Sequence, residues 1–505
     1  MKKPKTTRIV IRRNELNRKK SLQKNLRLRY KTPNKSLPLA IASALLAVSY
    51  ADHSLAAAFQ LIEQSGTGAG NAHAGEAARA SDTSTVFFNP AGMTRLSGHQ
   101  ADVALHFIAP KFDFEGTSAF NPDNPTVQAA RLNSVPVDQG SGSSKGGVNA
   151  VIPNVYYVHD YSQDLKFGIG LNVPFGLMTE YDEQWAGRYS AIKSNLQTLN
   201  LNPSFGYKIN EQFAIGGGIN LMYATVELTN AVDYNLVYNL ARFRNPELPD
   251  IPLVPGSTSG DGIAKVSGDD WAVGFNVGLL WEPRKGTRLG FTYRSKMALD
   301  ITGDAIFGNP SDPRSQKAVN VLRGAAGLFK DVDAEASMDL PETIALHFYH
   351  DLSPKLAIMG GVNWMKWDRI ENLVIKFDNP AQADSVTRLN YENSTFSSLG
   401  LNYKHSPQWT FKTGIAYDQS PVTDAQERSP RTPDADRFWL ALGATYSKSK
   451  HLSFDISYAH LFIDDLEINS SEAHSAGAHD SGYHLVSGQY KASVDILGMQ
   501  LNWRF

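Results

Sequence analysis

The chain has 505 residues, of which 42% are hydrophobic and 20% charged, and its mean hydropathy is −0.30. It contains no apolar run of about 18 residues, which excludes a bundle of membrane helices. Its many Phe, Tyr and Trp residues exclude a disordered chain. The absence of Cys excludes disulfide scaffolds, Cys-ligated zinc and Cys nucleophiles. Abundant Gly beside abundant aromatic residues favours an all-β protein with many turns.

The net charge of −1 conceals a basic N-terminus. Residues 1–35 carry 14 Lys and Arg against a single acid, Glu15. The apolar stretch LPLAIASALLAV follows at 37–48, and small residues suited to signal peptidase follow at 54–58. This order predicts a secretory signal peptide over 1–56, with an unusually long basic region. The apolar run is too short for a membrane anchor, and the order of the parts argues against a nucleic-acid-binding arm, so no nucleic-acid partner is expected.

Fourteen later segments alternate between apolar residues and small or polar residues, as strands with one apolar face do. In the segment from Lys166 to Phe175, for example, Phe167, Ile169 and Leu171 share one face. The candidate strands are 99–110, 148–159, 165–175, 196–208, 212–229, 270–282, 287–301, 337–349, 355–368, 394–404, 409–417, 437–447, 452–461 and 493–505. Their connections alternate between three to five residues and 19 to 40 residues, as in outer-membrane barrels.

These features predict an all-β fold in which 99–505 form a 14-stranded antiparallel transmembrane β-barrel. Closure satisfies every backbone group in lipid, and an even strand number places both termini with the short turns, in the periplasm. The last strand alternates up to Phe505, which resembles the assembly signal that the barrel-insertion machinery reads. We therefore expect a monomer in the cell outer membrane of a Gram-negative bacterium, in contact with outer-membrane lipid.

Residues 57–98 do not alternate like a strand. They contain Phe59-Gln60-Leu61, a Gly-rich stretch, an A-G-E-A-A stretch and then N-P-A. With the later P-D-A-D-R-F-W stretch at 433–439, these motifs resemble the FadL-type long-chain fatty-acid outer-membrane transporter family, which also includes aromatic-hydrocarbon transporters. The resemblance covers most of the mature chain. It implies an N-terminal hatch that plugs the barrel lumen, with these hatch residues: Gly68, Gly70, Gly75, Glu76, Asn89, Pro90 and Ala91.

The resemblance also implies passive transport of hydrophobic molecules, foremost long-chain fatty acids. Substrate would be captured by external loops, the hatch would move, and exit would be lateral through the wall at a kinked third strand. Gly168, Gly170 and Pro174 can interrupt pairing there and form the predicted lateral gate. The candidate substrate-binding residues are apolar loop residues and one base: Phe175, Leu177, Met178, Trp185, Leu236, Leu240, Phe243 and Arg188. Residues 234–243 are predicted to be helical, with Leu236, Leu240 and Phe243 near one face. Packing of these apolar residues against one another is an equal alternative.

The charge of the substrate stays open at this point. The end of the fifth strand, 226–230, and the tenth strand region, 391–403, lack the base that fatty-acid members are expected to place beside an inner pocket. Uptake of neutral aromatic hydrocarbons is therefore the alternative function. Several inward polar positions are interpreted simply as polar lumen surface: Lys166, Asn172, Asn200, Asn202, Asn220 and Arg294.

A general porin and an outer-membrane phospholipase are less favoured. A porin would have an open aqueous lumen rather than a plug of small and apolar residues. There is no P-loop and no G-x-S-x-G motif. His474, His479 and His484 fall in a loop rich in Gly, Ser and Ala and are interpreted as solvated. No enzyme activity, cofactor or metal is expected.

Overall fold

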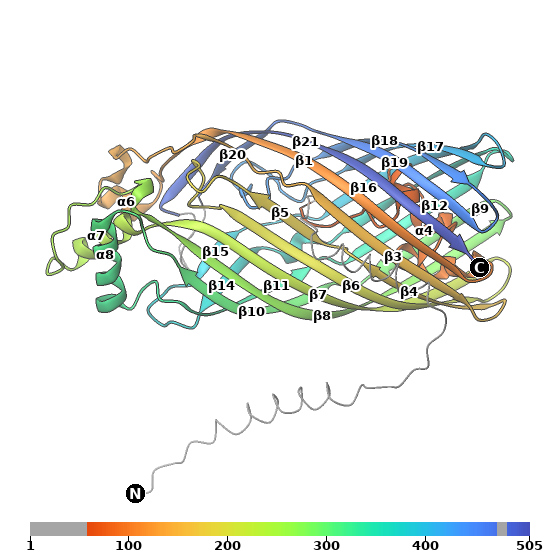
Figure 1. Cartoon of the computed structure of the whole chain (residues 1–505), viewed down its shortest axis with the longest axis horizontal. Coiled ribbons are helices and arrows are strands. Elements are labelled where there is room, and N and C mark those ends of the chain that lie inside the picture. The colour runs from red at the N-terminus through yellow and green to blue at the C-terminus, as the bar shows by residue number, and fades with distance from the viewer. Residues whose placement is uncertain (1–57, 472–481) are drawn as a thin grey trace, which may run out of the picture. The chain divides into compact units, whose positions relative to one another are not determined.

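The computed structural model describes residues 58–471 and 482–505, so the predicted signal peptide over 1–56 lies outside the described residues. Strand β1 (Gln100–Phe120) pairs with β3 (Ala150–Asp160) on one side. On its other side β1 pairs along its whole length with the last strand, β21 (His484–Arg504). The sheet thus closes into the predicted 14-stranded antiparallel barrel (Figure 1). No helix among the described residues is long and apolar enough to cross a membrane.

Eleven of the fourteen spanning strands are continuous. They are β1, β3, β6 (Lys193–Lys208), β7 (Phe213–Asp233), β8 (Asp261–Arg284), β13 (Leu356–Met365), β16 (Ser394–Lys404), β17 (Trp409–Asp418), β18 (Arg437–Ser447), β19 (Leu452–Ile463) and β21. The third, seventh and eighth are each broken in two: β4 (Leu165–Asn172) with β5 (Gly176–Glu180), β9 (Thr287–Arg294) with β10 (Met297–Phe307), and β11 (Val332–Leu340) with β12 (Thr343–Asp351).

Several spanning strands run further than predicted. The first was expected to end at 110, whereas β1 continues to Phe120. In this extension Phe112 and Phe114 are buried, while Asp113 and Glu115 point outward and are exposed. The prediction followed exposed apolar faces, and these end where the outward side chains become charged. The long connections are correspondingly shorter than expected.

The two ends of the barrel differ. Turns of two to four residues join β3 to β4, β6 to β7, β8 to β9, β12 to β13, β16 to β17 and β18 to β19. Longer connections join the strands at the other end, and they contain α6 (Pro125–Ala129), η2 (Leu132–Ser134), β2 (Ser143–Lys145), α7 (Tyr234–Arg244), η3 (Thr258–Gly260), α8 (Pro313–Val321), η4 (Leu322–Ala326), η5 (Trp367–Arg369), β14 (Asn372–Phe377), β15 (Ser385–Arg388) and β20 (Leu466–Ser470). In Figure 1, α6, α7 and α8 lie at the end opposite to the C-terminus.

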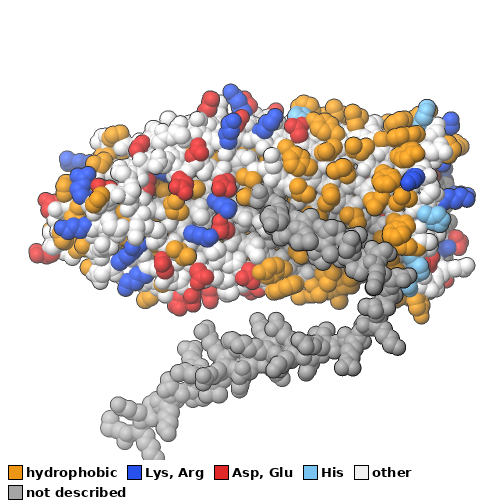
Figure 2. Space-filling model, viewed as in Figure 1, with side chains coloured by type: hydrophobic (Ala, Val, Ile, Leu, Met, Phe, Trp, Pro, Cys, Tyr) orange, Lys and Arg blue, Asp and Glu red, His pale blue; other side chains and the backbone are white. Residues whose placement is uncertain are grey.

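The outer surface carries an apolar belt. Along β4, Phe167 and Ile169 are exposed whereas Lys166 is buried, so apolar side chains face outward and polar ones inward. Figure 2 shows hydrophobic side chains gathered over the part of the barrel nearest the C-terminus, and more charged side chains towards the other end. Such a belt is what a barrel presents to lipid.

Residues 58–98, here called the lumenal segment, fill the barrel interior. They form α3 (Gly66–Ala69), α4 (Glu76–Arg79), α5 (Thr85–Phe88) and η1 (Pro90–Arg95), and nearly all are buried. Glycines allow the segment to touch the wall. A Cβ on Gly70 would lie 3.0 Å from the Cα of Gly443 in β18. Gly75 has a φ of 69°, in the left-handed region that favours glycine.

Candidate functional site

The N-P-A motif anchors the lumenal segment to the wall. The Asn89 Nδ2 donates to the carbonyl oxygens of Ala77 (2.7 Å) and of Leu279 in β8 (3.1 Å), and its Oδ1 accepts from the Ala91 N–H at 3.1 Å. Pro90 starts η1, where its missing N–H costs nothing. A Cβ on Gly278 of β8 would lie 2.1 Å from the Asn89 Oδ1, so this contact requires glycine in the wall.

A buried charge cluster lies inside the lumenal segment. The Arg79 Nη2 is 3.0 Å from both Glu76 Oε2 and Asp82 Oδ2, and all three side chains are buried. Burial raises the pKa of Glu76 to about 7, although the nearby Arg79 guanidinium acts in the opposite direction. Gly68 makes room for Glu76, because a Cβ there would fall 1.4 Å from the Glu76 Oε1. The predicted residues Gly68, Gly75 and Glu76 thus belong to one packed unit.

The wall is interrupted in the third spanning strand. β4 ends at Asn172 and β5 begins at Gly176, and the described part of β3 before Val155 has no ladder partner on this side. The lumenal segment covers the interruption. The Leu61 N–H donates to the Pro174 carbonyl (2.9 Å), and the Gly176 N–H donates to the Phe59 carbonyl (2.9 Å). We call residues 173–175 the wall break.

Gly168 and Gly170 were predicted to interrupt strand pairing, and for these two residues the prediction is wrong. Both residues pair with β3 and with β6. The interruption lies a few residues further along the chain, around Pro174. The glycines instead allow close packing on the lumenal face. A Cβ on Gly168 would lie 2.5 Å from the Met93 Sδ, and one on Gly170 would lie 2.9 Å from the Tyr156 ring. The Tyr156 hydroxyl in turn donates to the Gln64 carbonyl at 3.1 Å.

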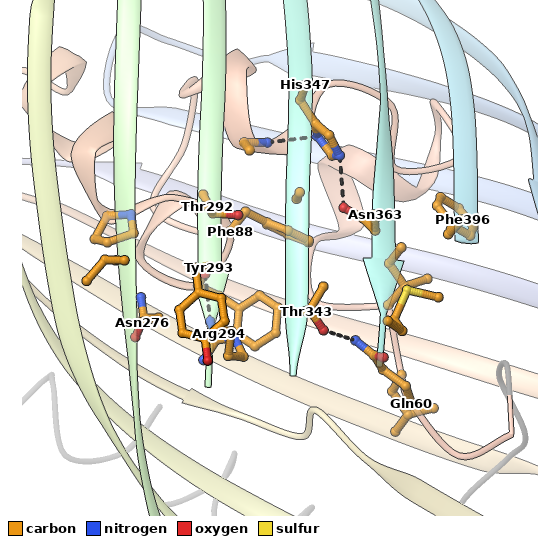
Figure 3. Close-up of a pocket in the computed structure, with 18 of the residues that line it drawn as sticks. Gln60, Phe88, Asn276, Thr292, Tyr293, Arg294, Thr343, His347, Asn363 and Phe396 are labelled. Carbon is orange, nitrogen blue, oxygen red and sulfur yellow. Dashed lines mark hydrogen bonds between the residues drawn. The ribbon is translucent and has the colours of Figure 1, made fainter. Parts of the chain in front are cut away.

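An inner cavity lies between the lumenal segment and the wall (Figure 3). Its apolar lining includes Leu61, Ile62, Phe88, Met365 and Phe396. Its polar lining includes Gln60, Asn276, Arg294, Thr343 and His347. Figure 3 shows Asn276, Arg294 and Thr343 from wall strands, with Gln60 and Phe88 from the lumenal segment, around one space. Leu61 therefore contributes to the cavity lining, while its backbone pairs at the wall break.

Arg294 at the end of β9 provides a cation in this cavity. Its Nη1 donates to the Asn220 Oδ1 (2.5 Å), its Nη2 donates to the Phe87 carbonyl (2.7 Å), and its guanidinium lies 4.0 Å above the Phe87 ring. The sequence interpretation placed Arg294 on the lumen surface but gave it no role. The fifth and tenth strands, where fatty-acid members of the family are expected to place a base, provide none to this cavity.

An outer cavity is lined mainly by apolar side chains. They include Leu177, Leu196, Val226, Ile301 and Met338. Arg431 also lines it and lies 3.4 Å from the hydroxyl of Ser194 and 3.4 Å from the side-chain oxygen of Asn230. Arg431 was not singled out from the sequence, because the connection over 419–436 has no periodic pattern that orients its side chains.

The apolar residues predicted to capture substrate are largely packed against one another. Phe175, Leu177 and Trp185 belong to one buried cluster, and Met178 is also buried. Trp185 stacks on Tyr181 at 4.1 Å between ring centroids. Leu177 also lines the outer cavity, whereas Phe175, Met178 and Trp185 do not.

The predicted loop helix exists as α7, but its apolar face is shorter than expected. Leu236 and Leu240 are buried in a cluster with Phe120 and Val127. Phe243, which was expected to share that face, is 72% exposed. It occupies the last turn of α7, beyond the residues that cover Leu236 and Leu240, so the shared face is buried only over its first turns.

Arg188 is held by hydrogen bonds to residues of several segments at the loop end of the barrel. Its Nε donates to the Asp261 Oδ2 (2.7 Å), its Nη1 to the Asp138 carbonyl (2.8 Å) and its Nη2 to the Tyr189 hydroxyl (2.9 Å). The side chain is buried and lines neither cavity. In this conformation Arg188 stabilises the loops and is not placed to bind a substrate carboxylate.

The described residues form a closed barrel whose interior holds the N-terminal segment and whose third spanning strand leaves part of β3 without a ladder partner. The comparisons place it more narrowly. The sequence model of the family "Outer membrane protein transport protein (OMPP1/FadL/TodX)" matches residues 47–505. The chain therefore belongs to this family.

Two relatives illustrate the sequence similarity. The long-chain fatty acid transport protein of Escherichia coli O6:H1 (strain CFT073) is 31% identical over 431 residues, covering 84% of this chain and 90% of the relative. Outer membrane protein P1 of Haemophilus influenzae (strain ATCC 51907 / DSM 11121 / KW20 / Rd) is 30% identical over 414 residues, covering 80% and 86%. The family description and the name of the Escherichia coli relative are both those of transport proteins.

Solved structures show the same fold. A Pseudomonas aeruginosa FadL homologue superposes with a TM-score of 0.76 at 22% identity, covering 89% of this chain and 100% of the other. The Pseudomonas putida toluene transporter TodX superposes with a TM-score of 0.62 at 17% identity, covering 89% and 100%. At these identities the likeness concerns the fold alone.

Proposed function

We propose that this protein passively transports hydrophobic molecules, foremost long-chain fatty acids, across the outer membrane. The similarity to proteins named long-chain fatty acid transport proteins supports this choice. Neutral aromatic hydrocarbons are the second candidate, supported by the fold shared with a toluene transporter and by the apolar lining of the outer cavity.

One observation carries the proposed route. Residues 59–64 lie between the inner cavity and the wall break: Gln60, Leu61 and Ile62 line the cavity, while the Leu61 N–H bonds the Pro174 carbonyl. The Gln64 Nε2 also donates to the Val173 carbonyl at 2.7 Å. A shift of this stretch would connect the cavity with the wall. Lateral exit there keeps an apolar chain out of periplasmic water, where its exposure is costly.

In this proposal the lumenal segment acts as the hatch and the long connections capture substrate outside the cell. Both termini then lie in the periplasm with the short turns, as an even number of strands requires. The protein acts as a monomer without cofactor. The barrel-insertion machinery is its assembly partner, and outer-membrane lipid covers the apolar belt.

The lateral route is tested by Gly170→Phe. The new ring would start beside the Tyr156 ring and the Asn172 Nδ2, which lies 3.2 Å from a Cβ at this position, next to the wall break. We expect strongly reduced uptake of radiolabelled oleate by cells that lack their own outer-membrane fatty-acid transporter. The matched control is Gly217→Phe, where the nearest side chain is Phe205 on the exposed face.

Barrel formation is checked in both variants by the shift in gel mobility on heating. Normal oleate uptake by a folded Gly170→Phe barrel would overturn lateral exit at this site. The porin alternative is tested separately by swelling of proteoliposomes in sugars. Wild-type protein is expected to cause none, and swelling would refute a plugged transporter.

A further inference from the structure

Arg294 carries a charge that the described residues do not neutralise. Guanidinium has five N–H donors, and here one donates to an amide oxygen and one to a carbonyl. No Asp or Glu among the described residues forms an ion pair with it. Arg79, Arg188 and Lys412, by contrast, each pair with a carboxylate. Arg288 also has no such acid, but two backbone carbonyls hold it and it does not line the cavity.

A second unused donor lies beside Arg294. Asn276 of β8 lies opposite Arg294 of β9 in the β-sheet, is buried and lines the same cavity. Its Oδ1 accepts from the Nδ2 atoms of Asn202 and Asn220, both at 3.0 Å, but its own Nδ2 has no partner among the described residues. A guanidinium and a free amide N–H on one cavity wall form a site that lacks an anion.

From this site a row of buried asparagines crosses the wall toward the break. The Arg294 Nη1 bonds Asn220, and the Asn200 Nδ2 links the Oδ1 atoms of Asn220 (3.0 Å) and Asn172 (3.1 Å). Asn172 is the last residue of β4 before the wall break. Its Nδ2 again has no partner among the described residues. We call Asn276, Asn220, Asn200 and Asn172 the asparagine ladder.

We propose that Arg294 and Asn276 bind the carboxylate of an amphiphilic substrate, and that the asparagine ladder leads this carboxylate from the inner cavity to the wall break. The proposal rests on the proposed function and names the residues that would bind and lead the carboxylate of a long-chain substrate. A single carboxylate matches the single positive charge of Arg294. The apolar lining of Leu61, Phe88 and Phe396 matches the chain behind it.

A neutral hydrocarbon fits this wall less well. It would displace water from Arg294 without supplying an acceptor, and a buried charge left unpaired is costly. It would also gain nothing from free N–H groups at both ends of the ladder. Asp418 lies elsewhere in the cavity lining and is 3.8 Å from Arg437, so it has its own cation.

The test compares a charged and a neutral ligand with the same chain. Binding of oleate and of oleyl alcohol is measured with wild type, Arg294→Met and Arg294→Lys in lipid nanodiscs. We expect Arg294→Met to weaken oleate binding by about 10- to 100-fold, as the loss of a hydrogen bond to a charged group does. Oleyl alcohol should change by less than about threefold on the same reasoning. Arg294→Lys should restore part of the oleate affinity, because it keeps the charge but loses the planar fork.

The ladder is tested by uptake. Asn200→Leu keeps the size of the side chain and leaves the cavity lining untouched, so oleate binding should persist while oleate uptake falls and oleyl alcohol uptake does not. Asn402→Leu is the matched control, since Asn402 belongs to β16 and lies outside the ladder. Equal loss for both ligands in Arg294→Met would show that Arg294 only supports Phe87, and would overturn the proposal. An unchanged oleate affinity would overturn it too.

The ladder itself fails if Asn200→Leu leaves oleate uptake intact, or if Asn402→Leu lowers it equally. These outcomes are distinct from failure of the proposed function. If the proposed function were wrong, the wild-type protein would take up neither oleate nor oleyl alcohol.

Discussion

Replacing Asn89 by Ala should loosen the lumenal segment without unfolding the barrel. The Asn89 side chain is fully buried and makes three hydrogen bonds, to the carbonyls of Ala77 and Leu279 and from the Ala91 N–H. Each contributes about 1 kcal/mol net, so the substitution should cost the packed segment about 3 kcal/mol. That cost corresponds to roughly a hundredfold rise in the population of displaced segments. The strand ladders are untouched.

The assay is ion conductance of single barrels in planar bilayers. Wild type should be mostly closed, and Asn89→Ala should open about a hundred times more often because packing of the segment is weaker by about 3 kcal/mol. Asn71→Ala removes two comparable bonds, from Asn71 Nδ2 to the carbonyls of Leu401 and Thr413, and should also increase opening. Asn245→Ala, at the exposed end of α7, is the negative control. If Asn89→Ala stays as closed as wild type, the bonds of the N-P-A motif do not hold the plug.

Three further outcomes are expected. Burial raises the pKa of Glu76 and of Glu63 to about 7, against 4.5 for an ordinary Glu. Between about pH 4.5 and 7 the packed lumenal segment therefore binds more protons than the displaced segment. Packing is therefore firmest at low pH, barrels should open more at pH 8 than at pH 5, and Glu76→Gln should reduce this difference. Arg188→Met, which leaves Asp261 without its cation, should weaken oleate and oleyl alcohol binding to the same extent; a loss confined to oleate would return Arg188 to the carboxylate site. Deleting Phe505, whose N–H bonds the His99 carbonyl, should lower the outer-membrane yield at low expression while the exported precursor accumulates, as immunoblots of membrane fractions can show.

Most of the barrel could be predicted because lipid on one side and a packed lumen on the other impose alternation on each strand. Phe167 and Lys166 are such neighbours on opposite faces. The same rule missed the outer parts of the strands, where Asp113 and Glu115 replace the apolar face. It pointed to Pro174 as an interruption but could not separate it from Gly170, which remains paired.

The candidate site was harder to predict, because its chemistry depends on contacts between distant residues. Arg294 alternates like any inward residue, and nothing in the local sequence shows that Phe87 supplies a carbonyl or that no acid among the described residues pairs with Arg294. For Arg188 the sequence suggested a binding role that the structure does not support. Its place among loop aromatics suggested ligand binding, but Asp261, which follows it by 73 positions, already satisfies its charge.

An amphiphile poses a problem that neither a porin nor a hydrocarbon channel has to solve. Its chain is stabilised wherever water is excluded, but its carboxylate pays a desolvation cost at each step without hydrogen-bond donors. The inner cavity of this barrel offers apolar walls on the lumenal segment and free N–H groups on the strand wall, at Arg294 and Asn276. The stretch 59–64 that closes the break bonds the Val173 carbonyl through the Gln64 side chain, next to Asn172 in the chain. Moving that stretch while the ladder stays fixed in the sheet would release the chain to lipid without leaving the headgroup unsolvated.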